Sequence, residues 1–273
     1  MTTARVTSTA SATAQAEAET ETAARAPASG AAPAGAPTVA ARLHGWDVVG
    51  ESGPPPAVEV GSIGIFGGTF DPIHYGHLAL AEEAREVLGL ERVIFVPAAI
   101  PPHKIGRPIT PAEDRVCMVE LAIGENSAFE LSSVELEREG PSYTVDTLVQ
   151  LRALMEERYS RSLPEPTLIL SAESFSQLRS WHEPEQIFDL CRIAVAPRPG
   201  HAMPARDAFL AAFPGTSPRI VALHGLSFGH SSSDVRARVA AGRSIRYQVP
   251  LAISAYIEDH RLYEAPSRRN PAS

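Results

Sequence analysis

Short apolar runs alternate with longer amphipathic stretches along most of the chain. The apolar runs have the length of strands, and they predict strands over 62–67, 92–97, 129–131, 134–138, 167–171, 192–197 and 219–223. The stretches between them predict helices over 78–88, 111–123, 143–159, 184–190, 205–213, 233–241 and 250–259. In the first of these stretches, Leu78, Ala81, Ala84 and Leu88 recur with the period of a helix that has one apolar face.

Strands that alternate with helices along a chain form a parallel sheet covered by helices on both faces. We therefore predict an α/β fold built on a doubly wound parallel sheet. Ligands of such sheets bind outside the carboxyl ends of the strands, near the point where the strand order reverses. Gly67 ends the first predicted strand, so we expect a ligand site beside it.

The N-terminal segment differs in composition from the rest of the chain. Its first forty residues contain fifteen alanines and no Leu, Ile, Phe, Tyr or Trp. Such a segment cannot bury enough apolar surface to offset the entropy lost on ordering. We predict a disordered Ala/Pro-rich extension over 1–58, one folded domain over 59–265 and a disordered C-terminal tail over 266–273. The extension lacks the apolar region of a signal peptide.

Composition also narrows the location and the partners of the protein. No apolar run reaches the eighteen residues that a membrane-spanning helix needs, so we expect no membrane partner. The formal net charge of −8 argues against a nucleic-acid partner, which would require a basic surface. The two cysteines, Cys117 and Cys191, are typical of small buried residues in a reducing cytoplasm. The sequence leaves the oligomeric state open, a homo-oligomer included.

The segment from Gly67 to His77 reads GGTFDPIHYGH and joins a strand to a helix. Two glycines, a turn and a helix start place backbone N–H groups where a phosphate can bind. His74 and His77 add side-chain donors on the same approach. A pair of histidines three residues apart can also be half of a zinc site, or can have no role. No further Cys or His cluster lies nearby in the sequence, so we favour phosphate binding.

Two later segments carry further candidate phosphate ligands. Pro101-Pro102-His103-Lys104 follows the second strand, and Lys104 could reach a polyphosphate, although a loop lysine is often only solvated. Ser231-Ser232-Ser233 opens a predicted helix, with Arg236 one turn further along. Hydroxyl groups, helix N–H groups and a guanidinium suit an anion. The alternative is an ordinary serine cap with a surface arginine.

Two other segments suggest contacts with a flat or polar ligand. Trp181 lies in a short segment after the strand predicted over 167–171 and could stack on an aromatic ring, or could simply be part of the core. Pro141-Ser142-Tyr143-Thr144 begins a predicted helix after a turn, so its N–H groups could face a ligand.

Taken together, six segments have the spacing of one known family. They are GGTFDP-x-H-x-GH, PPHK, GPSYT, L-x-x-W, RPG at 198–200 and SS-x-x-x-R. In these the chain resembles bacterial nicotinate mononucleotide adenylyltransferase, from about residue 61 to 263. The H-x-G-H element alone indicates only the wider nucleotidyltransferase superfamily, whereas PPHK and PSYT make the narrower resemblance specific.

The resemblance implies a Rossmann-like domain that joins ATP and nicotinate mononucleotide, giving deamido-NAD and pyrophosphate in NAD biosynthesis, with Mg²⁺ arriving on ATP. It implies four catalytic residues: His74, His77, Lys104 and Arg236. It implies an ATP site formed by Gly67, Gly68, Thr69, Phe70, Ser232 and Ser233. It implies an acceptor site formed by Thr144, Trp181, His182 and Glu173, with Trp181 stacked on the pyridine ring.

One segment departs from the family pattern. Where the family usually has Gly-x-Asp, this chain has Ser171-Ala172-Glu173. Ser171 adds a side chain where backbone could approach a ligand, and Glu173 has a longer arm than aspartate. Two other interpretations therefore remain open: an adenylyltransferase that uses another acceptor, such as nicotinamide mononucleotide, and a nucleotide-binding regulator without catalytic activity.

Overall fold

The computed structural model describes residues 45–46, 48–49, 61–104, 106, 108–160, 162–198, 200–224 and 229–265. Its strands are β1 (Val48–Val49), β2 (Ile63–Gly68), β3 (Arg92–Pro97), β4 (Phe129–Leu131), β5 (Thr167–Ser171), β6 (Arg192–Ala196) and β7 (Ile220–Leu223). Its helices are α2 (Tyr75–Leu88), α3 (Ala112–Ile123), α4 (Thr144–Tyr159), α5 (Ala172–Ser176), α6 (Pro184–Leu190), α7 (Arg206–Ala212), α8 (Ser232–Ala240) and α9 (Leu251–Asp259). Among the described residues, no helix is long and apolar enough to cross a membrane. The predicted C-terminal tail lies outside them.

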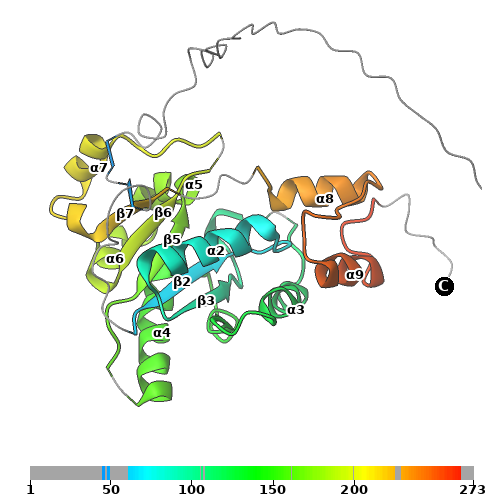
Figure 1. Cartoon of the computed structure of the whole chain (residues 1–273), viewed down its shortest axis with the longest axis horizontal. Coiled ribbons are helices and arrows are strands. Elements are labelled where there is room, and N and C mark those ends of the chain that lie inside the picture. The colour runs from blue at the N-terminus through cyan, green and yellow to red at the C-terminus, as the bar shows by residue number, and fades with distance from the viewer. Residues whose placement is uncertain are drawn as a thin grey trace, which may run out of the picture. The chain divides into compact units, whose positions relative to one another are not determined.

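The strands form one sheet in the order β1-β7-β6-β5-β2-β3-β4, and all neighbours are parallel. From β2 the chain builds the sheet outward through β3 and β4, and it then returns to β5 and builds in the opposite direction (Figure 1). This is the Rossmann-like, doubly wound order, with its reversal between β2 and β5. The predicted fold class is confirmed.

Successive residues of each central strand pack on opposite faces of the sheet, as the period of a strand requires. Ile65 belongs to a core cluster that includes residues of α4, α5, α6 and α7. Its neighbour Phe66 belongs to a second cluster, which includes residues of α2, α3, α8 and α9. Both faces of the sheet are therefore covered by helices, as predicted.

The prediction of a strand over 134–138 is wrong. These residues pair with no strand of the sheet and form turns. The segment instead turns, and Leu136 N–H donates to the Ser133 carbonyl at 2.8 Å. The turn lets the Glu135 carboxylate accept a hydrogen bond from the Thr147 hydroxyl at 2.7 Å.

Part of the predicted N-terminal extension belongs to the fold. Trp46 is buried, and its indole N–H donates to the Pro204 carbonyl at 2.9 Å. Strand β1 pairs with β7 at the edge of the sheet. The predicted boundary at residue 58 is wrong for these residues, because one tryptophan and two valines supply the apolar surface that the alanine-rich residues before them lack. The rest of the extension lies outside the described residues.

Candidate active site

The loop after β2 lies at the reversal of strand order. A Cβ atom on Gly68 would come within 2.8 Å of the Phe70 ring, so this position requires glycine. Nothing lies within 4 Å of a Cβ atom on Gly67, so this side of the backbone is open to a ligand. Phe70 has a positive φ of 48° and a buried ring, which leaves its backbone rather than its side chain available to ATP.

Both histidines of the GGTFDPIHYGH segment lie at the start of α2. The rings of His74 and His77 are stacked with their centroids 3.7 Å apart. The backbone N–H of His74 donates to Nδ1 of His77 at 3.2 Å. Because Nδ1 accepts a hydrogen bond, a neutral His77 carries its proton on Nε2, at the far side of the ring. The Phe70 ring packs edge-on against His77, with the centroids 5.1 Å apart, and fixes its orientation.

Both imidazoles are neutral at pH 7. Burial, with the nearby charges of His230 and Arg198, lowers the pKa of His74 from 6.5 to about 4. Burial, followed by the charge of His74, lowers the pKa of His77 well below its usual value. Each ring therefore offers one N–H donor to an anion without a second proton. Two stacked cationic rings would repel each other.

The neutral state of His74 predicts a loss of stability in acid. The unfolded chain binds a proton near pH 6.5 and the folded protein near pH 4. This contribution is therefore complete above pH 6.5 and is lost as the pH falls toward 4. One pKa unit corresponds to about 1.4 kcal/mol, so the free energy of unfolding should fall by up to about 3 kcal/mol. Urea unfolding at pH 7 and pH 4.5 measures this decrease.

The control for this prediction is the replacement of His74 by glutamine, which does not titrate. His74→Gln should show a smaller decrease in stability between the two pH values. His260→Gln, at an exposed position, should keep the decrease of the wild type. An equal decrease in all three proteins would contradict the buried, neutral state of His74.

Two backbone N–H groups at the start of α2, which were expected to be open to a phosphate, are hydrogen-bonded within the protein. The Tyr75 N–H donates to the Gln248 carbonyl at 3.0 Å, and the His77 N–H donates to the His74 carbonyl at 2.9 Å. The expectation that this helix start presents open N–H groups is therefore wrong for these two residues. The histidine side chains remain the donors of this segment.

Lys104 lies against the loop after β2 rather than in solvent. It ends a short 3₁₀ turn (Pro102–Lys104), and its ammonium group donates to Oγ1 of Thr69 at 3.0 Å. Burial and the charge of Arg236 lower the pKa of Lys104. Because the charge of Arg236 contributes to this lowered pKa, the two cations lie close enough to interact electrostatically.

The start of α8 is bonded to the same loop. The Ser231 hydroxyl caps the helix by accepting the Asp234 N–H at 3.0 Å, as in the alternative of an ordinary serine cap. The Ser232 hydroxyl donates to the Pro72 carbonyl at 2.9 Å. Arg236 donates to the Asp71 carbonyl at 2.5 Å. The two predicted anion-binding segments therefore meet at residues 71–72.

Arg236 also donates to the hydroxyl of Ser233, at 3.2 Å. Ser232 and Ser233 thus hold the helix start and its arginine in place. Their position beside ATP remains a prediction.

Sequence reasoning missed two residues of this region. The hydroxyl of Tyr263 donates to the Asp71 carboxylate at 2.8 Å, and nothing in the local pattern of the C-terminal segment indicates this contact. Arg115 is fully buried in α3 beneath the loops. The signal for Arg115 was present, because it shares a helix face with Met118 and Val119, where an apolar residue is expected.

Two of the predicted acceptor residues, Thr144 and His182, lie at or beside the start of α4. Thr144 is the first residue of this helix, and Tyr143 is its N-cap. The ring of Tyr143 stacks on that of His182, with centroids 4.2 Å apart. Trp181 is partly buried and packs against the core cluster of this sheet face, so one edge of the indole is structural.

The segment that departs from the family pattern has local partners. The Ser171 hydroxyl caps α5 by accepting the Ser174 N–H at 3.2 Å. The Glu173 carboxylate forms an ion pair with Arg198, and Nε2 of His201 lies 3.9 Å from it. Ser171 therefore has a structural role of its own. A contact from Glu173 to the acceptor remains a prediction.

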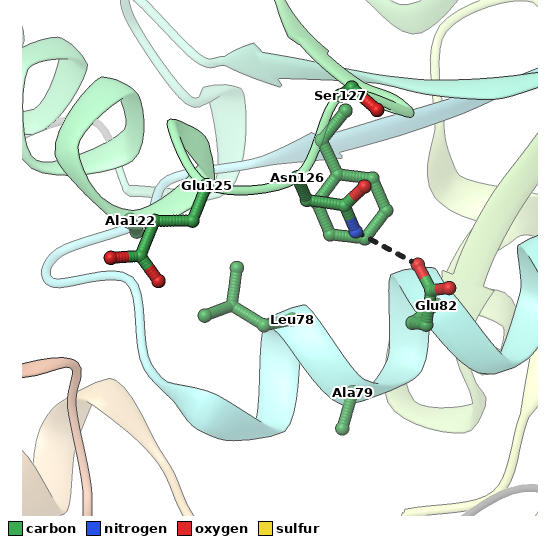
Figure 2. A pocket seen from close by; sticks show the side chains of 8 residues that line it. Leu78, Ala79, Glu82, Ala122, Glu125, Asn126 and Ser127 are labelled. Carbon is green, nitrogen blue, oxygen red and sulfur yellow. Dashed lines mark hydrogen bonds between the residues drawn. The ribbon is translucent and has the colours of Figure 1, made fainter.

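A separate surface pocket of about 510 Å³ lies between α2 and the segment after α3 (Figure 2). Leu78, Ala79 and Glu82 line one side of it. Asn126 lies opposite and donates to the Glu82 carboxylate at 3.0 Å, as Figure 2 shows. None of the predicted catalytic or substrate-binding residues lines this pocket.

Comparisons with known proteins agree on one family. Residues 65–238 match the Cytidylyltransferase-like family. A probable nicotinate-nucleotide adenylyltransferase of Thermomicrobium roseum is 45% identical over 209 residues, which cover 77% of this chain and 94% of that protein. One from Roseiflexus sp. is 47% identical over 201 residues, which cover 74% and 97%. The structure of Plasmodium falciparum nicotinic acid mononucleotide adenylyltransferase complexed with NaAD has the same fold, with a TM-score of 0.60 and 20% identity over 74% of this chain and 97% of that one.

Proposed function

The chain belongs to the nicotinate-nucleotide adenylyltransferase family, and we propose that its site transfers AMP from ATP to nicotinate mononucleotide. The products are deamido-NAD and pyrophosphate, and the reaction is a step of NAD biosynthesis. The observation that carries this proposal is the gathering of two neutral imidazoles and two cations around the loop after β2. These groups are His74, His77, Lys104 and Arg236.

The reaction is a displacement at the α-phosphorus of ATP. A phosphate oxygen of nicotinate mononucleotide attacks this phosphorus, the bond to the bridging oxygen breaks, and the electron pair leaves with pyrophosphate. The attacking phosphate is already ionised at neutral pH, so the site needs no strong base. Catalysis then depends on positioning the two substrates and on stabilising the charge of the transition state.

The histidines act on the α-phosphate. Nε2–H of His77 donates to a phosphate oxygen, because its Nδ1 is engaged by the His74 backbone. His74 lies in the adjoining stacked position and donates from the same side. Donors that are fixed before the substrate arrives stabilise developing charge without reorganising in the transition state.

The two cations bind the departing pyrophosphate. Lys104 is held by the Thr69 hydroxyl, and Arg236 is held by the Asp71 carbonyl. Both anchors belong to the loop that also leads to His74. Charge-assisted hydrogen bonds to phosphate are stronger than neutral ones, so this arrangement stabilises the leaving group.

Mg²⁺ is expected to enter with ATP. Among the described residues, no three His, Cys, Asp or Glu side chains lie close enough to hold a metal ion. Mg²⁺ is commonly bound by phosphate oxygens and water with few protein ligands. We therefore propose that ATP brings the ion and that it supplies charge neutralisation on the phosphates.

The acceptor binds at the start of α4. The backbone N–H groups of Thr144 and His182 suit the pyridine carboxylate, and Trp181 presents a ring for stacking. The stacked pair of Tyr143 and His182 holds these two segments together. The positive end of the helix macrodipole adds to the attraction of a carboxylate.

This acceptor site predicts a preference for the acid over the amide. Nicotinate mononucleotide should exceed nicotinamide mononucleotide by at least about tenfold in kcat/KM, because a charge-assisted bond is roughly twice as strong as a neutral one. Steady-state rates with the two acceptors at the same concentration of ATP measure this ratio. Equal rates would contradict the assignment of the α4 start to a carboxylate.

Pyrophosphate release from Mg-ATP tests the function itself. Each acceptor is supplied in turn to the folded protein, and release is expected with nicotinate mononucleotide. Faster release with the amide would identify the alternative acceptor. ATP binding without release for any acceptor would identify a regulator.

A further inference from the structure

Arg115 is among the largest fully buried side chains, with 1% of its surface exposed. It lies in the first turn of α3, and none of the steps above uses it. Burial of a guanidinium is strongly unfavourable unless its charge and its donors are compensated. Among the described residues, no ion pair includes Arg115.

The partners of Arg115 are three backbone carbonyls. Nε donates to the carbonyl of Thr110 at 2.9 Å. Nη1 donates to that of Thr69 at 2.8 Å, and Nη2 to that of Ala99 at 3.3 Å. The planar guanidinium presents its donors in a fixed fork, so one side chain can bond three separate segments at once. Lysine keeps the charge but cannot reproduce this geometry.

Two of these carbonyls belong to the loops that hold the phosphate ligands. Thr69 follows β2, and its hydroxyl accepts from Lys104. Ala99 follows β3 and precedes the turn that carries Lys104. The next residue, Ile100, exchanges hydrogen bonds with Ser142, directly before the start of α4. Arg115 therefore connects the loop after β2, on the proposed ATP side, with the segment that leads to the start of α4, on the proposed acceptor side.

The positive charge of Arg115 acts on Lys104, one of the residues predicted to bind the phosphates. Burial is the main cause that lowers the pKa of Lys104, and the charges of Arg236 and Arg115 lower it further. Burial lowers the pKa of Arg115 itself, and the negative charge of Asp71 opposes this shift. A cation beneath the loops adds positive potential where a triphosphate would bind, and it does so from a region of low dielectric constant.

We propose that Arg115 is a positioning residue for adenylyl transfer, which sets the Thr69 loop against the Ala99 loop and adds its charge beneath the triphosphate. This proposal rests on the proposed function for its kinetic consequences. It concerns a residue that touches neither substrate. Its two parts, geometry and charge, can be separated by substitution.

The test compares Arg115→Lys and Arg115→Met with the wild type. A matched control is Arg92→Met, because Arg92 is partly buried and pairs with Glu91 and Glu130, but it begins β3 at the opposite end of the strand. Thermal unfolding curves are used to choose a temperature at which the wild type and all three variants are folded. Binding of Mg-ATP without acceptor is measured by calorimetry, and kcat by pyrophosphate release.

Arg115→Met should weaken Mg-ATP binding by about tenfold and lower kcat by about tenfold or more, as expected from the loss of charge and of loop positions. Arg115→Lys should bind Mg-ATP with an affinity within about threefold of the wild type, but its kcat should still be lowered. Arg92→Met should be less stable than the wild type but keep the wild-type Mg-ATP affinity and kcat. A folded Arg115→Met with wild-type binding and kcat would overturn the proposal, as would equal losses in Arg92→Met.

The binding measurement also separates the two proposals. A wild type that binds Mg-ATP but releases no pyrophosphate would contradict the proposed function. The charge of Arg115 would still be tested by the binding constants of the three variants. In that case, unchanged binding in Arg115→Met would overturn its role as well.

Discussion

Replacement of His77 by alanine is expected to lower kcat by roughly 10²-fold or more, because removal of one fixed donor at a reacting centre typically has an effect of this size. Nε2–H is the donor lost, since Nδ1 is already bonded to the His74 N–H. His74→Ala should behave similarly. Single-turnover rates with saturating ATP and nicotinate mononucleotide measure the chemical step directly.

A second substitution separates catalysis from folding. His77→Asn keeps an acceptor oxygen near the place of Nδ1, so it can still accept the His74 N–H, but it has no group at the position of Nε2. We expect this variant to lose kcat as His77→Ala does, with a melting temperature closer to that of the wild type. His260→Ala, at an exposed position, should retain full activity. Wild-type turnover in His77→Asn would assign the effect of alanine to packing.

The sheet could be predicted from the sequence because its central strands are apolar at successive positions. Ile65 and Phe66 face opposite sides, and each finds its own core cluster. A strand with one polar face would not require helices on both sides. The glycine turn and the histidines could be predicted for a similar reason, since their function depends on residues that are close in the chain.

The contacts that close the site could not be predicted in this way. Tyr263 reaches Asp71 across 192 residues, and Arg236 reaches the same residue across 165. Hydrophobic periodicity describes which face of an element is buried, but it does not say which distant side chain meets which loop. Arg115 was an interruption of an apolar helix face, and its partners are backbone carbonyls that a sequence pattern cannot identify.

Trp46→Ala is expected to lower the free energy of unfolding by about 3–5 kcal/mol, the usual range for a large aromatic residue removed from a core. Trp46 packs edge-on against Phe175 and Phe209, with ring centroids 5.5 and 5.6 Å away. Its indole N–H also donates to the partly buried carbonyl of Pro204. Deletion of residues 1–57 should destabilise at least as much, because it removes β1 as well.

Urea unfolding followed by circular dichroism measures this loss without relying on the fluorescence of the tryptophan that is removed. Trp46→Phe keeps an aromatic ring but leaves the Pro204 carbonyl without its donor, so it should lose only about 1–3 kcal/mol. Tyr247→Ala is the surface control, since Tyr247 is 81% exposed and its loss should change stability by less than about 0.5 kcal/mol. Should Trp46→Ala behave like Tyr247→Ala, the N-terminal segment would contribute nothing to the core. If the indole is buried and hydrogen-bonded, the loss of stability should be largest for Trp46→Ala, smaller for Trp46→Phe and smallest for Tyr247→Ala.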